Sequence, residues 1–333
     1  MKTIRKSWWR RIQLFLIGTL VFIFTQSSCG IVRQQFQADK PKVVSSECRT
    51  VEHQLGKTCI PLHPKRVIVM DQESLEILVA LGINPIASTI ANRVGSKLEI
   101  LQEKTGEIVN LGKEGQPNLE KIVELRPDLI VGMFILPQNY SLLSQIAPTV
   151  SIEYSQTGWK QTLKQVAEIV DKVQESKQLL DDYQQKIARF REAFLQKTGK
   201  LEICIMRFYT TLQFTQFLNQ NSFTVSVMEE LGVLSIPEIQ RQQIQIPNSD
   251  YGYINTSLEQ VYLLEADKMF IALDPGAKSN LEVYENSPLW QTLNVVKQNQ
   301  VYIVDSGYWI FGNILSANAI LDDLFKYLVK NEN

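Results

Sequence analysis

The chain has 333 residues, of which 44% are hydrophobic and 21% are charged, and its formal net charge at pH 7 is only -1. Proteins that bind nucleic acid through phosphate contacts present a basic surface, so this near-neutral balance argues against that class. The length fits about two domains with ordinary buried cores.

The N-terminus combines a charged start with an apolar stretch. Several lysines and arginines precede an apolar core from Ile12 to Phe24, which is followed by the small residues Ser27 and Ser28. This is the order of a secretory signal segment. The apolar core is shorter than the ~20 residues that a membrane-spanning helix needs. We therefore expect a signal segment over 1–29 and a flexible tether over 30–47.

Cys29 directly follows these small residues, and FTQSSCG resembles a bacterial lipobox, in which cleavage leaves an N-terminal cysteine that carries lipid. The position three residues before the cysteine is usually aliphatic and is Gln26 here. The alternatives are a lipidated Cys29 and ordinary cleavage near Ser28 with an incidental cysteine. We expect the lipid, which would hold the mature protein at the cell membrane.

Two of the four cysteines enclose a hairpin-like stretch. Cys48 and Cys59 flank CRTVEHQLGKTC, which reads as two short strands around a turn. In an exported chain such a pair can form a disulfide, whereas free thiols are the alternative that an oxidising compartment disfavours. Cys204 lies inside the apolar run EICIM and is expected to be a small core residue.

From here on, short apolar runs alternate with helical patterns, which is typical of an α/β domain with a largely parallel sheet. The expected strands of the first half are RVIVM (66–70), INPIAST, EIVNLG, DLIVGM and TVSIEY. Residues 171–198 contain no glycine or proline and predict one long helix. Strand-like runs then resume in EICIMRF, KMFIAL and VYIVD, and NILSANAILDDLFKYLVK has the spacing of an amphipathic helix.

These patterns predict an α/β fold of two doubly wound lobes with mostly parallel sheets. The N-terminal lobe is expected over 48–170 and the C-terminal lobe over 199–333, joined by the linking helix over 171–198. A ligand cleft is expected between the lobes.

The two halves also resemble each other. NLEKIVELRPDLIVGM (118–133) and SLEQVYLLEADKMFIA (257–272) align without a gap. The identical positions are Leu119/Leu258, Glu120/Glu259, Leu125/Leu264 and Asp128/Asp267. An internal repeat and convergence on a generic helix-strand unit both explain this match, and either gives two similar lobes.

Six segments of the sequence resemble a known family. The segments that carry the likeness are VEHQLGKTCIPLHPKRVIVMD, ALGINPIA, NLGKEGQPNLEKIVELRPDLIVG, SFTVSVMEELGV, SLEQVYLLEADKMFIAL and NSPLWQTLNVVKQNQVYIVD. In this order, over 48–330, they are similar to the class III solute-binding proteins of ABC importers, which capture ferric siderophores, haem or cobalamin. The hairpin and the lack of iron ligands most resemble the ferric-siderophore branch, particularly its cyanobacterial lipoproteins.

The resemblance implies a monomeric periplasmic receptor, not an enzyme, that delivers a ferric siderophore to an ABC-transporter permease dimer in the inner membrane. Haem and cobalamin are the alternative ligands within the family. The family also implies one exposed glutamate on each lobe that docks against permease arginines, and the matching positions here are Glu120 and Glu259.

The composition agrees with a chelated rather than a bare metal. Zinc or manganese receptors need several histidines with carboxylates, and this chain has two histidines in total, His53 and His63. Both lie in or near the hairpin and are expected at the surface. A siderophore fills the coordination sphere of iron itself, so we expect no cofactor, and recognition requires cations and aromatic faces.

Open α/β sheets place ligands beyond the carboxyl ends of their strands. The candidates at such positions are Arg207, Tyr209, Tyr308 and Trp309 in the second lobe, and Phe134, Trp159 and Arg93 in the first. We expect Arg207 to neutralise an anionic chelate and Trp309 to stack on it. For Trp159 core packing is favoured, because it opens a helix whose apolar face must be buried. Residues 241–256 have no counterpart in the family pattern and are expected to form a ligand-specific loop.

Two other classes compete with a binding protein. A serine or cysteine hydrolase needs a base beside its nucleophile, and neither histidine is placed for that role. No Gly-rich phosphate loop or nucleophile elbow occurs in the sequence. A carboxylate-pair hydrolase is not excluded by spacing alone, but no acidic pair stands out. A structural adhesion module on the cell surface is the other alternative.

Overall fold

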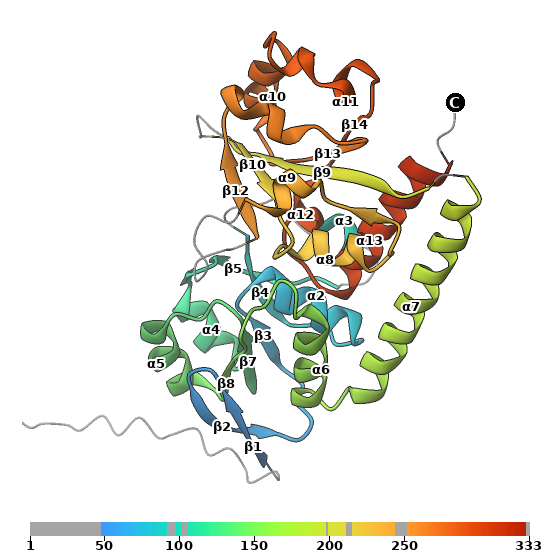
Figure 1. Cartoon of the computed structure of the whole chain (residues 1–333). Helices are drawn as coiled ribbons and strands as arrows, with labels where there is room; N and C mark the ends of the chain where they lie inside the picture. Colours follow the sequence, from blue (N-terminus) through green and yellow to red (C-terminus); the bar gives the residue numbers. More distant parts are fainter. Residues whose placement is uncertain are drawn as a thin grey trace, which may run out of the picture. The chain divides into compact units, whose positions relative to one another are not determined.

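The structure is a computed structural model that describes residues 48–91, 98–101, 106–197, 199–210, 215–243 and 252–330. All of these belong to one compact unit, Ser46–Asn333. They form two α/β lobes with one long helix between them in the sequence (Figure 1). The predicted signal segment, tether and lipidated Cys29 lie outside the described residues.

The N-terminal lobe is a hairpin followed by a six-stranded sheet. The hairpin strands are β1 (Cys48–His53) and β2 (Gly56–Pro61). The sheet has the spatial order β6 (Gln116–Pro117), β5 (Val109–Lys113), β4 (Ala87–Ile90), β3 (Val67–Val69), β7 (Leu129–Gly132), β8 (Thr149–Ser151). Its helices are α2 (Gln72–Ala80), α3 (Leu98–Leu101), α4 (Leu119–Leu125), α5 (Pro137–Ile146) and α6 (Trp159–Ile169). All neighbouring strands are parallel except β5 and β6.

The continuous apolar runs of this lobe follow from burial on both faces of its sheet. Successive side chains of a strand point to opposite faces. Val67 and Val69 accordingly pack in one buried cluster with Leu163 of α6, whereas Ile68 packs on the other face with Ile122 of α4. A parallel sheet covered by helices on both sides has no polar face, which removes the alternating pattern of a half-exposed strand.

Helix α7 (Val173–Leu195) is the predicted long helix and is seen as one continuous rod in Figure 1. Its buried side chains include Tyr183, Ile187, Phe190 and Phe194. These recur every three or four residues, which places them on one face of the helix.

The C-terminal lobe contains a second six-stranded sheet. Its spatial order is β12 (Tyr253–Thr256), β10 (Thr215–Leu218), β9 (Leu201–Phe208), β13 (Lys268–Leu273), β14 (Val301–Asp305), and β11 (Leu234–Ser235) also pairs with β9. The helices are α8 (Phe223–Glu229), α9 (Glu238–Arg241), η1 (Leu258–Leu264), α10 (Lys278–Glu285), η2 (Trp290–Thr292), α11 (Asn294–Lys297), α12 (Ser306–Trp309), α13 (Ile314–Phe325) and η3 (Lys326–Lys330). Strands β9, β11, β13 and β14 pair in parallel, whereas β10 and β12 are antiparallel additions. The predicted α/β fold class is confirmed.

The described residues of both lobes share their largest hydrophobic cluster. One face of the first sheet contributes Val67 and Val131, and one face of the second contributes Ile205 and Phe270, to the same buried cluster. The outer face of the second sheet has a separate cluster that includes Cys204, as expected for a small core residue. Burial raises the pKa of the Cys204 thiol to about 12. The lobes are therefore held by a common core as well as by α7.

The aspartates of the repeated helix-strand units make similar backbone contacts in both lobes. The Asp128 carboxylate accepts hydrogen bonds from the backbone N–H groups of Lys65 and Arg66, both at 2.8 Å. The Asp267 carboxylate accepts one from the N–H of Glu202, also at 2.8 Å. Each aspartate thus ties the start of its strand to the strand beside it. The sequence match therefore reflects equivalent structural positions.

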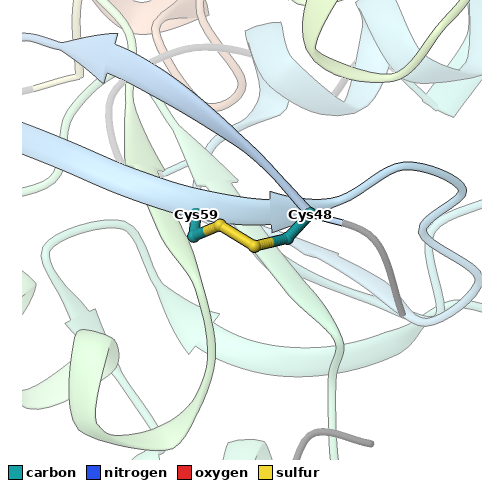
Figure 2. Close-up of a disulfide and its surroundings, with 2 residues drawn as sticks. All are labelled: Cys48 and Cys59. Carbon is teal, nitrogen blue, oxygen red and sulfur yellow. A yellow bond between two sulfur atoms is a disulfide. The ribbon is translucent and has the colours of Figure 1, made fainter. Parts of the chain in front are cut away.

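The hairpin contains the predicted disulfide between Cys48 and Cys59, whose Cα atoms are 5.6 Å apart (Figure 2). The two residues are not directly opposite, because Cys48 pairs with Pro61 and Cys59 with Thr50.

The hairpin also contacts the edge strand β8. The N–H of Gln54 donates to the Ser151 carbonyl at 3.1 Å, and the Thr58 hydroxyl donates to the Thr149 carbonyl at 2.9 Å.

The expectation that both histidines are surface residues is wrong for His53. This side chain is buried, lies 3.0 Å from the Thr58 hydroxyl and packs edge-on against Tyr140. His53 is the last residue of β1, and the turn folds back so that its ring is covered by α5. His63 is exposed, as expected, and lies 3.8 Å from the Asp171 carboxylate.

Candidate functional site

The carboxyl end of β3 is organised by the buried carboxylate of Asp71. This side chain caps α2 by accepting from the N–H of Ser74 at 2.7 Å. Its other oxygen accepts from the N–H of Met133, just beyond β7, at 2.6 Å. Burial raises the pKa of Asp71, and these hydrogen bonds oppose the shift by stabilising the ionised form. Asp71 therefore fixes the ends of two neighbouring strands at the edge where ligands are expected.

Aromatic side chains from both lobes meet beside this edge. Phe134, which is 42% exposed, lies 5.0 Å between ring centroids from Tyr154, just beyond β8. Tyr154 lies in turn 6.1 Å from Phe311, which follows α12 in the C-terminal lobe. We call Phe134, Tyr154 and Phe311 the aromatic row. It presents apolar ring surface at the strand ends.

The hydroxyl of Tyr154 points into an acidic environment. Burial, followed by the charges of Glu73, Glu76 and Asp71, raises the pKa of Tyr154 well above its usual range. Within the described residues its oxygen has no hydrogen-bond partner. Both effects favour the protonated, neutral phenol of Tyr154.

In the C-terminal lobe, Arg207 is paired rather than open to solvent. It lies near the end of β9, is only 3% exposed, and donates to both oxygens of Asp274 at 3.2 and 3.0 Å. Asp274 directly follows β13, the strand next to β9. The guanidinium also lies 4.3 Å from the ring centroid of Tyr209, whose pKa is raised to about 12, mainly by burial. The charge of Arg207 is therefore compensated inside the protein.

Trp309 does not fit its predicted role as a stacking surface. Its side chain is 0% exposed and its ring stacks on Phe270 at 4.9 Å. The indole N–H and the Tyr308 hydroxyl both donate to the Asp323 carboxylate of α13, each at 2.8 Å. The short helix α12 turns Trp309 into the core, so the tryptophan and the half-buried Tyr308 both anchor α12 to α13.

The remaining predictions for the ligand site concern Trp159, Arg93 and the segment 241–256. Trp159 is a core residue, as favoured, and packs edge-on against Tyr183 at 5.3 Å and Phe223 at 6.0 Å. Arg93 lies outside the described residues and stays a prediction. In the segment 241–256, residues 241–243 and 252–256 are described: Arg241 ends α9, and β12 at the C-terminal end pairs with β10. The ligand-specific loop stays a prediction.

Both predicted docking glutamates are exposed. Glu120 is the second residue of α4, and Glu259 is the second residue of η1. The Ser257 hydroxyl donates to the Glu259 carboxylate at 2.6 Å, and this bond lowers the pKa of Glu259.

The described part of the chain offers neither a metal-binding cluster nor a membrane-spanning helix. No group of histidine, cysteine, aspartate and glutamate side chains there is arranged to hold a metal ion. No described helix combines the length and apolar character that crossing a membrane requires.

Sequence reasoning missed Tyr154, Phe311 and Asp274. Tyr154 directly follows the strand-like TVSIE and is closer to the strand end than Trp159, so its position was a usable signal for a ligand residue. Asp274 likewise follows KMFIAL directly. For Phe311 no local signal distinguishes it from Trp309, because the inward turn of α12 decides which ring is buried.

The fold and the strand-end residues define a two-lobed α/β binding protein, and comparisons with known proteins agree. The family described as "Periplasmic binding protein" matches residues 67–308, and the chain belongs to this family of substrate-binding proteins.

The relatives cover most of the chain. The probable siderophore-binding lipoprotein YfiY of Bacillus subtilis (strain 168) is 29% identical over 96% of this chain and 97% of its own length. The achromobactin-binding periplasmic protein of Dickeya dadantii (strain 3937) is 31% identical over 78% of this chain and 85% of its own. The crystal structure of Staphylococcus aureus SirA complexed with staphyloferrin B is 27% identical, with a TM-score of 0.71, and covers 84% of this chain and 98% of SirA.

Proposed function

We propose that this protein is an extracytoplasmic receptor that binds a ferric siderophore and delivers it to an ABC-transporter permease for iron uptake. The observation that carries the proposal is similarity over 78% to 96% of the chain to proteins whose names or titles refer to a siderophore. The chelator would hold the iron, so the receptor needs no metal ligands of its own.

We place the binding surface at the aromatic row and at Tyr209. These rings offer apolar and π surface to a chelator. We assign Arg207 a positioning role: it holds the ends of β9 and β13 together through Asp274 and supports the ring of Tyr209. An anionic chelate would have to compete with Asp274 for the guanidinium, which is unfavourable for a buried, already satisfied pair.

The ligand class is tested by a thermal-shift panel on the purified mature protein. The panel contains ferric staphyloferrin B, ferric achromobactin, ferric citrate, a ferric hydroxamate, haem, cobalamin and uncomplexed Fe³⁺. A ligand that binds the folded state raises the melting temperature by mass action, so we expect a shift with at least one ferric siderophore. A shift with haem or cobalamin alone would reassign the ligand, and no shift with any of them would refute the proposal.

The site is tested with the ferric siderophore that gives the largest shift. Tyr209→Ala and Phe134→Ala should each weaken binding by about tenfold, the effect of about 1.4 kcal/mol of lost aromatic contact. Tyr262→Ala, which removes an exposed ring at η1, is the matched control and should bind as wild type. Equal affinities for all three variants would exclude this surface as the site.

We further propose that the lipid on Cys29 keeps the receptor beside its permease. Two relatives are named lipoproteins, and the FTQSSCG stretch supports the same attachment here. Mass spectrometry of the membrane-extracted protein should find a diacylglyceryl group on Cys29. A mature chain that begins elsewhere, or an unmodified Cys29, would contradict it.

A further inference from the structure

Two exposed apolar side chains accompany the glutamates at equivalent positions of the two lobes. Val123 of α4 is 55% exposed and Tyr262 of η1 is 62% exposed. In the gapless alignment of 118–133 with 257–272, Val123 matches Tyr262, just as Glu120 matches Glu259. We call Glu120 with Val123 the N-terminal patch, and Glu259 with Tyr262 the C-terminal patch.

The burial of the neighbouring residues shows that this correspondence is structural. Ile122 and its counterpart Val261 are both buried, so each helix packs on its own sheet in the same orientation. Val123 and Tyr262 come directly after these positions and turn away from the core. Each lies three residues after its glutamate, a spacing that brings side chains together on one side of a helical turn. In η1 the turn is loosened at Gln260, between the two residues of the patch.

The carboxylates are available for an external cation. Neither Glu120 nor Glu259 forms an ion pair with another residue in the described ranges. The neighbouring Lys121 does not occupy the first patch, because its ammonium group donates to the Asn110 carbonyl at 3.2 Å. The bond from Ser257 holds the Glu259 carboxylate in place without neutralising it.

Single exposed apolar residues are common on protein surfaces. Here, however, an acidic and an apolar side chain recur together at matching places on two similar lobes. A partner that recognises such a surface twice must present a cation beside an apolar pocket twice, as a dimer with two-fold symmetry does. Resting on the proposed function, we infer that Val123 and Tyr262 are apolar anchors by which the receptor docks onto the two membrane-embedded subunits of its permease.

The two anchors are unequal, and this has a consequence for docking. Tyrosine offers far more contact area than valine and is enriched among residues that dominate interface energetics. The C-terminal patch is therefore the stronger of the two. Loss of Tyr262 should impair docking more than loss of Val123.

The first experiment locates the contact in cells. The full-length chain carries the photo-cross-linking residue p-benzoylphenylalanine in place of Val123, Tyr262 or Val283. Val283 of α10 is the matched control, since it is an exposed helical valine (59%) with no counterpart in the repeat. Mass spectrometry should identify a multi-spanning ABC-permease subunit attached at positions 123 and 262 and none at 283. Absence of permease from both patches, or equal labelling at position 283, would overturn the inference.

The second experiment separates docking from ligand binding. Tyr262→Ala should reduce uptake of the ⁵⁵Fe-loaded siderophore from the thermal-shift panel by about tenfold or more, and Val123→Lys should reduce it as well by repelling the permease cation. Tyr262→Phe keeps the ring and should lose less uptake than Tyr262→Ala, Val283→Lys should transport at the wild-type rate, and all variants should bind the siderophore as wild type does. Wild-type uptake by Tyr262→Ala and Val123→Lys would refute the anchors. If no ferric chelate binds the wild-type protein, the proposed function fails, while the cross-linking still decides docking.

Discussion

Arg207 and Asp274 place two charged groups in a buried part of the C-terminal lobe. Both side chains are buried, and two hydrogen bonds join them. Removing charges from water costs several kcal/mol per ion, and the pair offsets this cost only while both partners are present. The pair therefore matters more for keeping β9 and β13 in register at the site than for net stability.

Removing one partner tests this interpretation. Asp274→Asn removes the carboxylate charge that pairs with the buried guanidinium, and we expect it to lower the free energy of unfolding at pH 7 by about 3–5 kcal/mol, measured by urea denaturation. The double variant Arg207→Met with Asp274→Leu removes both charges and should lose less than the single variant. A cost below about 1 kcal/mol for Asp274→Asn would mean that the pair behaves as a solvated one.

His53 gives stability a pH dependence. Its Nδ1 accepts from the N–H of Leu55 at 3.2 Å, which requires an unprotonated Nδ1, and burial lowers the pKa of His53. As the pH falls below about 6.5, the unfolded chain gains a proton that the folded chain does not, so stability decreases. His53→Asn, which keeps an acceptor for Leu55, should flatten the melting temperature between pH 7 and 5. His63→Gln should keep the wild-type slope, and identical slopes for all three proteins would contradict this role.

These residues show what a sequence can say about a site. Strand-end positions are predictable, because apolar runs end there, and Arg207, Tyr209 and Phe134 do lie at such ends. What a strand-end residue contacts depends on partners far away in the sequence. Asp274 forms an ion pair with Arg207. Trp309 stacks on Phe270 and donates to Asp323. None of these contacts leaves a local pattern.

At the scale of elements, the disulfide hairpin protects an edge of the first sheet. Strand β8 is the last strand of that sheet, and an open strand edge invites pairing with other chains. The hairpin covers it through Gln54 and Thr58. A two-stranded hairpin is only marginally stable by itself, so the disulfide and these contacts must hold it in place.

We expect the disulfide to stabilise the protein by about 2–3 kcal/mol, the chain-entropy value for so short a loop. Cys48→Ser with Cys59→Ser should lower the free energy of unfolding by that amount. A thiol reductant should have the same effect on the wild type and none on the double variant. Cys204→Ala retains the disulfide and should stay sensitive to reductant. If complete reduction left the free energy of unfolding of the wild type unchanged, the disulfide would not stabilise the protein.

The main elements were predictable because each has a strong local pattern. The long helix, the buried strands and the hairpin all follow from composition and periodicity. The antiparallel strands β10 and β12 were not predicted, since their residues TQFL and YINT are too short and mixed to signal a strand. Their pairing with each other and with β9 is a tertiary property.

At the scale of the whole molecule, several contacts besides α7 hold the two lobes. The largest hydrophobic cluster contains one face of each sheet. Glu76 of α2 is fully buried and accepts from the N–H groups of Asn313 and Ser316, at 3.0 and 2.7 Å, and from the Ser316 hydroxyl at 2.8 Å. These donors lie at the start of α13, so a first-lobe carboxylate caps a second-lobe helix.

This arrangement predicts a receptor whose lobes move little, with Glu76 as a main connection. Glu76→Ala leaves buried donors unsatisfied and should lower the free energy of unfolding by about 3 kcal/mol or more, because each such loss costs roughly 1–3 kcal/mol. Hydrogen exchange of the Asn313 and Ser316 amides should accelerate, and binding of a ferric siderophore should slow it again if the ligand bridges the lobes.

The matched control for Glu76 is another contact between the lobes. Lys160 of α6 lies 2.6 Å from Glu230, and both side chains are 30% exposed. Because this ion pair is partly solvated, Glu230→Ala should cost at most about 1 kcal/mol and leave exchange at Asn313 and Ser316 unchanged. If Glu76→Ala and Glu230→Ala lowered the free energy of unfolding equally, burial of the Glu76 carboxylate would not explain its contribution to stability. If Glu76→Ala exchanged like wild type at the start of α13, the shared hydrophobic core alone would have to hold the lobes.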